Sequence, residues 1–305
     1  MSKIWALLLV SAALLCIPLL GSRYLVDLTT EIIIYALFAL SLNVLIGYAG
    51  NVSFGHAAYF AIGGYSCAIL LTTYQWPLWL SLPTAVIISA VAALIIGYFC
   101  IRLTDIYFAM LTLAFSMLVW SAAFKWHPVT GGDDGFVGVR VPTLLEDRMA
   151  FYYFALGVVG LSAAALWRIC HSAFGRTLVA VRENPLRTGF VGIDVRKIRL
   201  AAFVVAGTFA GIAGALFAMY NRGMYTESAF WTESAQVLIM TLLGGMYSFF
   251  GPALGAAVLY LLEVSINQYT EYWPAILGTL LILIVLFLPD GLAGLAQKMR
   301  RSRKA

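Results

Sequence analysis

Long apolar segments follow one another along nearly the whole of this 305-residue chain. Most of them reach the roughly 20 residues that a helix needs to cross the hydrocarbon core of a bilayer. Inside a bilayer only helices and closed barrels satisfy their own backbone hydrogen bonds. The pattern therefore predicts an all-α fold, a polytopic membrane helical bundle. The segments fall at 4–21, 30–47, 54–73, 79–100, 106–124, 150–167, 200–220, 236–246, 252–267 and 273–289.

Composition supports a membrane protein with one domain. Charged residues make up 11% of the chain and hydrophobic residues 62%, whereas a soluble domain carries about 25% charged residues. We interpret residues 1–305 as a single transmembrane domain in contact with lipid. The four cysteines are scattered and indicate neither a disulfide framework nor a zinc site. The apolar run after Lys3 lacks a clear cleavage site, so we expect a retained first helix.

The distribution of basic residues predicts orientation. The loop 168–199 is strongly basic, and the tail 298–304 is basic as well, so both are expected inside. The net charge of +5 sits mainly in these two places, which favours orientation in a membrane and not nucleic-acid binding. Counting crossings backwards places the loop 125–149 outside and the N-terminus inside. Segments 236–246 and 252–267 then either both cross or form a re-entrant hairpin, and the shortness of 236–246 favours the hairpin. The total is about eight crossings plus this broken hairpin.

The centre of the loop 168–199 has the pattern of a short amphipathic helix. Apolar Leu178, Val179 and Val181 alternate there with charged residues. Pro185 and the glycines around it indicate a helix-and-turn unit. Such a unit on the cytoplasmic side suits the docking of a soluble partner. The alternative is a solvated, positively charged loop.

Two glycine-rich stretches interrupt the apolar pattern, the first break at 47–56 and the second break at 243–252. Broken backbone in a membrane is costly unless it is buried in protein or lines a cavity, so both breaks predict a translocation path. The alternative is close helix packing through small residues, and for His56 a hydrogen-bonded structural role. Both breaks contain Ser-Phe and precede a small-residue-rich helix, which suggests an internal repeat. The candidate path residues are Asn51, Ser53, His56, Gly244, Gly245 and Ser248.

Several kinds of chemistry are not indicated. Acidic residues are almost absent from the centres of the predicted spans, whereas ion-driven carriers need ionisable groups there. We therefore expect the energy for any transport to come from elsewhere. No phosphate-binding loop and no H-E-x-x-H or G-x-S-x-G motif occurs. The chain is thus expected to be non-catalytic and to bind no cofactor or metal itself.

Five stretches together resemble the branched-chain amino acid permeases of ATP-binding-cassette importers, of the LivM type. They are 47–65, 174–187, 211–217, 243–252 and 287–292, and they occur in the order found in that family. The resemblance implies a multi-pass subunit of the bacterial inner (plasma) membrane with cytoplasmic N- and C-termini. A paralogous permease subunit, two ATP-binding cassette subunits that use ATP, and a periplasmic solute-binding protein would be its partners.

The resemblance also implies roles for particular residues. The segment 175–193 matches the cytoplasmic coupling region of the family. The expected solute is a branched-chain or related small amino acid. Urea, short amides and aromatic acids remain alternatives, because their permeases are very similar and Asn51 and Phe54 depart from the commoner residues. A stand-alone carrier or channel, or an anchoring subunit without a pore, is the remaining alternative. The candidate ATPase contacts are Gly175, Arg176, Ala180, Arg182, Glu183, Asn184, Pro185 and Gly192.

Overall fold

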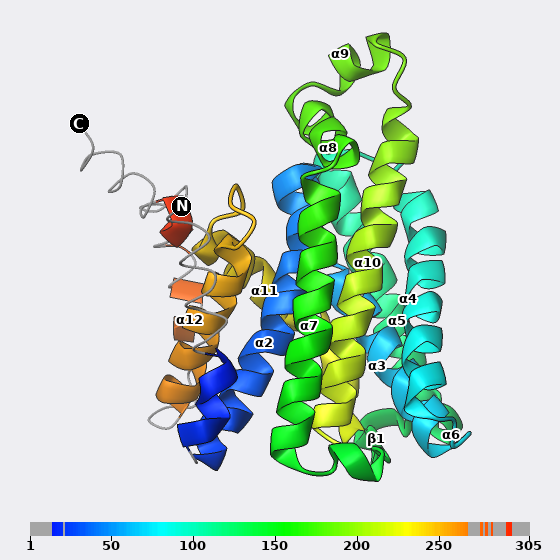
Figure 1. Ribbon diagram of the computed structural model, residues 1–305. Helices are drawn as coiled ribbons and strands as arrows, with labels where there is room; N and C mark the ends of the chain where they lie inside the picture. Colours follow the sequence, from blue (N-terminus) through cyan, green and yellow to red (C-terminus); the bar gives the residue numbers. More distant parts are fainter. Residues whose placement is uncertain are drawn as a thin grey trace, which may run out of the picture.

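The computed structural model describes residues 14–20 and 22–267, and short pieces between 275 and 294. Its long helices lie side by side as a bundle (Figure 1). The helices are η1 (Ile17–Leu20), α2 (Arg23–Asn43), the π-helical η2 (Val44–Tyr48), α3 (His56–Thr72), α4 (Leu78–Cys100), α5 (Asp105–Lys125), α6 (His127–Thr130), η3 (Gly132–Asp134), η4 (Thr143–Leu145), α7 (Arg148–Cys170), α8 (Ala173–Glu183), α9 (Pro185–Phe190), α10 (Val195–Tyr220), η5 (Thr226–Ala229), α11 (Trp231–Gly244) and α12 (Gly251–Asn267).

Five helices in the described part of the chain are long and apolar enough to cross a membrane: α2 with η2, α4, α5, α7 and α10. They confirm the predicted all-α membrane bundle. Several helices extend beyond the predicted apolar segments, because polar residues such as Arg23 and Arg148 form their first turns. The basic tail and most of the predicted spans 4–21 and 273–289 lie outside the described residues.

Helix α10 packs against α2, α3 and α4 near the middle of the bundle. Its glycines permit this close approach. A Cβ added at Gly211 would collide with the Ser89 side chain on α4, and one at Gly214 would collide with the carbonyl of Phe60 on α3. Small residues allow this kind of packing in membranes, where lipid gives helices no hydrophobic reason to associate. These glycines therefore let α10 approach α3 and α4 closely within a core that is otherwise filled by apolar side chains.

The two polar loops lie at opposite ends of the bundle (Figure 1). Helices α8 and α9 stand beyond the bundle at one end. At the other end, strand β1 (Phe136–Val137) pairs antiparallel with β2 (Gly223–Met224). This arrangement agrees with the predicted separation of the loops 168–199 and 125–149 onto different faces. The small β ribbon was not predicted, because neither two-residue strand has a sequence pattern of its own.

Helices α11 and α12 form a packed hairpin. Helix α11 has 14 residues, which gives it a length of about 21 Å, short of the ~30 Å hydrocarbon core. A Cβ at Gly244 would overlap the carbonyl of Gly251, and one at Gly255 would overlap that of Met240. The segments 236–246 and 252–267 thus form a broken helical hairpin, as the shortness of 236–246 predicted.

Candidate functional site

The first break lies between α2 and α3. Helix α2 passes into the π-helical turn η2, and the chain is then irregular until α3 begins at His56. Gly50 has φ of 75°, in the left-handed region that favours glycine. Gly47 is buried, and a Cβ there would collide with the carbonyl of Met246 in the second break. The glycines of the first break therefore provide a turn and a close backbone contact.

Other helices bind the polar backbone groups at the start of α3. The amide of Ala57 donates to Ser234 Oγ on α11 at 2.9 Å, and the amide of Phe54 donates to Thr112 Oγ1 on α5 at 3.3 Å. Ser53 is buried, and its Oγ accepts from the amide of Gly55 at 3.3 Å. Side chains of the protein thus accept hydrogen bonds from the backbone amides of the first break. Burial in protein is one of the two conditions under which irregular backbone is tolerated in a membrane.

His56 lies deep in this packing. Its side chain is fully buried, with Nε2 2.8 Å from Ser41 Oγ, and its ring stacks on Phe38 at 5.3 Å between ring centres. This environment matches one of the two roles expected for His56 from the sequence, that of a hydrogen-bonded structural histidine. Asn51 is half-buried in the same break, and its amide donates to the carbonyl of Leu45 at 2.9 Å. A role of these residues in a solute path stays a prediction.

The second break lies directly against the first. The side-chain amide of Asn43 donates to the carbonyl of half-buried Ser248 at 3.4 Å. Gly245 has φ of 103°, and Gly291 approaches it so closely that a Cβ on Gly291 would lie 2.5 Å from Gly245 Cα. The structure therefore brings together the two breaks, which are about 200 residues apart in the sequence. In each, a glycine break precedes a helix of 17 residues.

Arg182 on α8 contacts both breaks. Its guanidinium donates a hydrogen bond to the carbonyl of Gly47, and its aliphatic stem lies against Gly50. The guanidinium also lies over the ring of Tyr247, 5.3 Å from the ring centre. Among the candidate ATPase contacts, Arg182 thus faces inward. It connects the α8–α9 pair to the breaks.

The remaining residues of α8 separate into two faces. Leu178 and Val181 are buried against the bundle. Gly175 is buried with them, and a Cβ there would overlap the carbonyl of Cys170 at the end of α7. The outer face carries three of the candidate contacts, the exposed residues Arg176, Ala180 and Glu183. The predicted amphipathic helix is present with its charged face outward.

Helix α9 extends this unit away from the bundle (Figure 1). Half-buried Asn184 caps α9 by accepting from the amide of Arg187 at 2.9 Å, and exposed Pro185 is its first residue. Exposed Gly192 follows it, with φ of 90°. Three apolar side chains on the pair are strongly exposed: Leu186 at 77%, Phe190 at 90% and Val191 at 81%.

The exposure of this apolar tip was not predicted, because nothing in the sequence distinguishes Phe190 and Val191 from apolar residues that become buried.

The next helix begins with a charged cap. The Oδ1 atom of Asp194 accepts from the amides of Arg196 at 3.1 Å and Lys197 at 3.2 Å. These hydrogen bonds hold the pKa of the Asp194 carboxyl below its usual range, and the bond from the Lys197 amide has the largest effect. The carboxylate also balances the positive end of the α10 dipole. The cap fixes where α9 and its following turn rejoin the bundle.

Comparison with known proteins identifies the family of this chain. Residues 24–287 match the family described as "branched-chain amino acid transport system / permease component". The chain belongs to this permease family. The matched residues include both breaks, the α8–α9 pair and the α11–α12 hairpin. The family resemblance predicted from the sequence is therefore confirmed.

Individual relatives of the permease agree with this assignment. The permease is 32% identical to the high-affinity LivM permease protein of Escherichia coli K12, over 90% of this chain and 71% of that protein. It is 26% identical to a probable LivM of Methanocaldococcus jannaschii, over 88% and 93%. It is 22% identical to LivH of E. coli K12, over 85% and 91%. No solved structure matches the permease.

Proposed function

We propose that this permease is a subunit of an ATP-driven importer for branched-chain or related small amino acids. It acts in the bacterial inner membrane, with cytoplasmic N- and C-termini. A paralogous permease, two ATP-binding cassette subunits and a periplasmic solute-binding protein complete the importer. The permease catalyses no reaction and binds no cofactor, and the cassette subunits use the ATP. Its similarity both to LivM and to LivH supports a pair of related permeases.

The α8–α9 pair is the observation that carries this proposal. It stands beyond the bundle and exposes Leu186, Phe190 and Val191. Exposed apolar side chains on a short helix fit a groove on a soluble protein, which anchors a few of them. The same pair reaches the two breaks through Arg182. A partner that moves α9 would therefore also displace the residues of the breaks.

This geometry supports a mechanism of alternating access. Movement of a cassette subunit shifts the α8–α9 pair relative to α7 and α10. Arg182 transmits the shift to Gly47 in the first break and to Tyr247 in the second. The breaks are where the helices lack continuous backbone hydrogen bonds, so α3 and α12 move there at the lowest cost. Solute delivered from outside then gains access to the inside.

Uptake in cells tests the proposal. A strain that lacks the chain should lose uptake of low concentrations of labelled leucine and regain it with the wild-type gene. The double variant Leu186→Ser/Phe190→Ser should insert normally and fail to restore uptake. Leu144→Ser is the matched control, because Leu144 is 84% exposed and lies in the loop 125–149, away from α8 and α9. Full uptake by the double variant would contradict the docking role of α9.

The same assay separates the alternatives. Competition with valine, phenylalanine, urea and acetamide identifies the solute class, and urea as the preferred competitor would replace the amino acid assignment. Uptake that persists in a strain without the cassette subunits would instead identify a stand-alone carrier or channel.

A further inference from the structure

A cavity of about 450 Å³ lies at the end of the bundle opposite α8 and α9. It is formed where α2 and α7 begin and where α10 ends. This volume is in the range of small-molecule sites, about 300–1,000 Å³. The cavity lies away from both breaks and from the α8–α9 pair, so none of the roles described above uses it.

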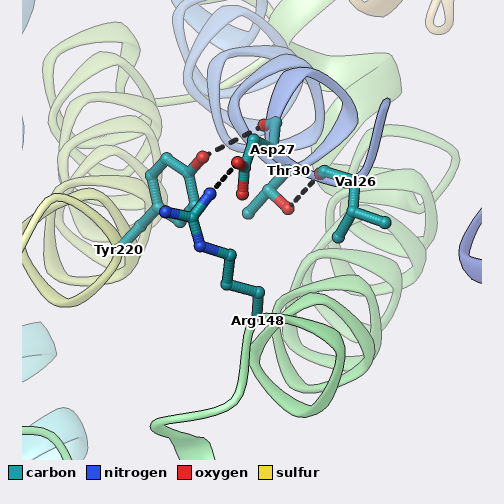
Figure 2. Close-up of polar contacts among 5 residues, drawn as sticks. All are labelled: Val26, Asp27, Thr30, Arg148 and Tyr220. Atoms are coloured by element: carbon teal, nitrogen blue, oxygen red, sulfur yellow. Dashed lines mark hydrogen bonds and ion pairs between the residues drawn. The ribbon is translucent and has the colours of Figure 1, made fainter. Parts of the chain in front are cut away.

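Charged residues of both signs line the cavity: the acidic Asp27, Glu31 and Glu146, and the basic Arg148 and Arg222. Asp27 and Glu31 line it from α2, where their spacing of four residues places them on the same face. Arg148 lines it from the first turn of α7, and Arg222 lines it just after α10. The Arg148 guanidinium donates to the Asp27 carboxylate (Figure 2). The carbonyl of Asp27 also accepts from the Tyr220 hydroxyl at 3.3 Å.

The ion pair in this cavity is accessible to solvent, because the side chain of Arg148 is 65% exposed and that of Asp27 is 26% exposed. Arg148 can therefore leave Asp27 without disturbing the core.

The cavity also has an apolar wall. Leu145, Phe151 and Met219 line it beside the charged groups. Adjacent carboxylate and guanidinium groups match the ammonium and carboxylate of an α-amino acid, and the apolar wall matches a hydrocarbon side chain.

We propose that this cavity binds a zwitterionic amino acid with an apolar side chain. Asp27 takes its ammonium group, with Glu31 beside it on the same face of α2, and Arg148 takes its carboxylate. The inference rests on the proposed function, in which this end faces outward and receives solute. The bound zwitterion replaces the Arg148–Asp27 ion pair with two pairs of its own, so Asp27 and Arg148 each keep an oppositely charged partner. A ligand with only one of the two charges leaves Asp27 or Arg148 without a partner and is disfavoured.

Ligand binding tests the proposal directly. The membrane complex captured through a tag on this chain, washed free of soluble binding protein, is placed in lipid nanodiscs. Dissociation constants are measured for leucine, for 4-methylpentanoate, which lacks the ammonium, and for 3-methylbutylamine, which lacks the carboxylate. Leucine should bind the wild type about 10- to 100-fold more tightly than either analogue. Equal affinity for the three compounds, or no binding of leucine, overturns the proposal.

Matched variants separate recognition from stability. Asp27→Asn should weaken leucine about tenfold or more and strengthen 4-methylpentanoate, which then leaves no carboxylate without its arginine; Arg148→Gln should weaken leucine and strengthen 3-methylbutylamine for the converse reason. Arg140→Gln and Asp134→Asn, exposed at the same end, should change none of the three. Loss of all three ligands in both cavity variants would indicate a structural role and contradict the assignment. Leucine uptake by the wild-type strain is scored separately. Its absence refutes the proposed function, whereas normal uptake with unselective ligand binding refutes only this inference.

Discussion

Replacing Arg182 with glutamine should uncouple the α8–α9 pair from the two breaks. The wild-type guanidinium donates to the carbonyl of Gly47 and lies 5.3 Å from the ring centre of Tyr247. A hydrogen bond from a charged donor contributes about 1.5–3 kcal/mol, and an exposed cation–π contact about 0.5–1 kcal/mol. Arg182 is half-buried, so solvent screens part of both contributions.

We expect a loss of about 2–3 kcal/mol in the coupling free energy between α8 and the breaks, which corresponds to about 30- to 150-fold in an equilibrium constant.

The assay is solute accumulation per ATP hydrolysed by the importer reconstituted in liposomes. Arg182→Gln should lower this ratio strongly while the amount of inserted protein stays normal. Tyr247→Leu should cause a smaller loss, and the double variant should resemble Arg182→Gln, because both contacts involve the same guanidinium. Arg196→Gln is the matched control, an exposed arginine at the same end of the bundle. An unchanged ratio in Arg182→Gln, or an equal loss in Arg196→Gln, would refute the reasoning.

Three further substitutions and one pH series test other parts of the account. Glu183→Arg, a charge reversal at an exposed position, should abolish uptake while membrane insertion is normal, and normal uptake would remove Glu183 from the docking surface. Gly245→Leu should lower the yield of the protein and lower its free energy of unfolding in detergent by about 1–3 kcal/mol, because φ of 103° strains any residue with a side chain. A variant as stable as the wild type would contradict that backbone conformation. Asn184→Ala should cost α9 about 1 kcal/mol by removing its cap, measured as faster exchange of the amide hydrogens of residues 186–190, and unchanged exchange would exclude the cap. The pKa of Asp194 is lowered in the folded protein, so its cap is complete above the ordinary carboxyl pKa and is lost as the pH falls through the lowered value. Protection of the first amides of α10 from hydrogen exchange, corrected for the intrinsic exchange rate, should therefore be constant down to about pH 5. A loss of protection above that pH would contradict the cap.

The membrane bundle was predictable because length and hydropathy alone require it. The segments 79–100 and 106–124 agree within one residue with α4 (Leu78–Cys100) and α5 (Asp105–Lys125), since a chain in lipid has few alternatives to a helix. The start of α2 was placed too late. Its first turns carry Arg23 and Asp27, and the partner of Asp27 is Arg148, which the sequence gives no means to identify.

The site was predictable as a set of regions but not as a set of contacts. Glycine and serine patterns marked both breaks, because irregular backbone needs them. The sequence did not reveal that the two breaks touch, nor that Arg182 turns inward to reach them, because each contact joins distant segments. His56 was expected either in a path or in the core, and the structure packs it against Ser41 and Phe38. The exposure of Phe190 ran against its apolar character, which by itself predicts burial.

We infer that this permease works as one subunit of an ATP-driven importer. The most direct test is a mild-detergent pull-down of the tagged chain expressed from its native locus, with ATPase activity measured on the eluate. We expect two cassette subunits and a second permease to co-elute with the chain, and the eluate to hydrolyse ATP. A chain that elutes alone, in good yield and without ATPase activity, would contradict this inference.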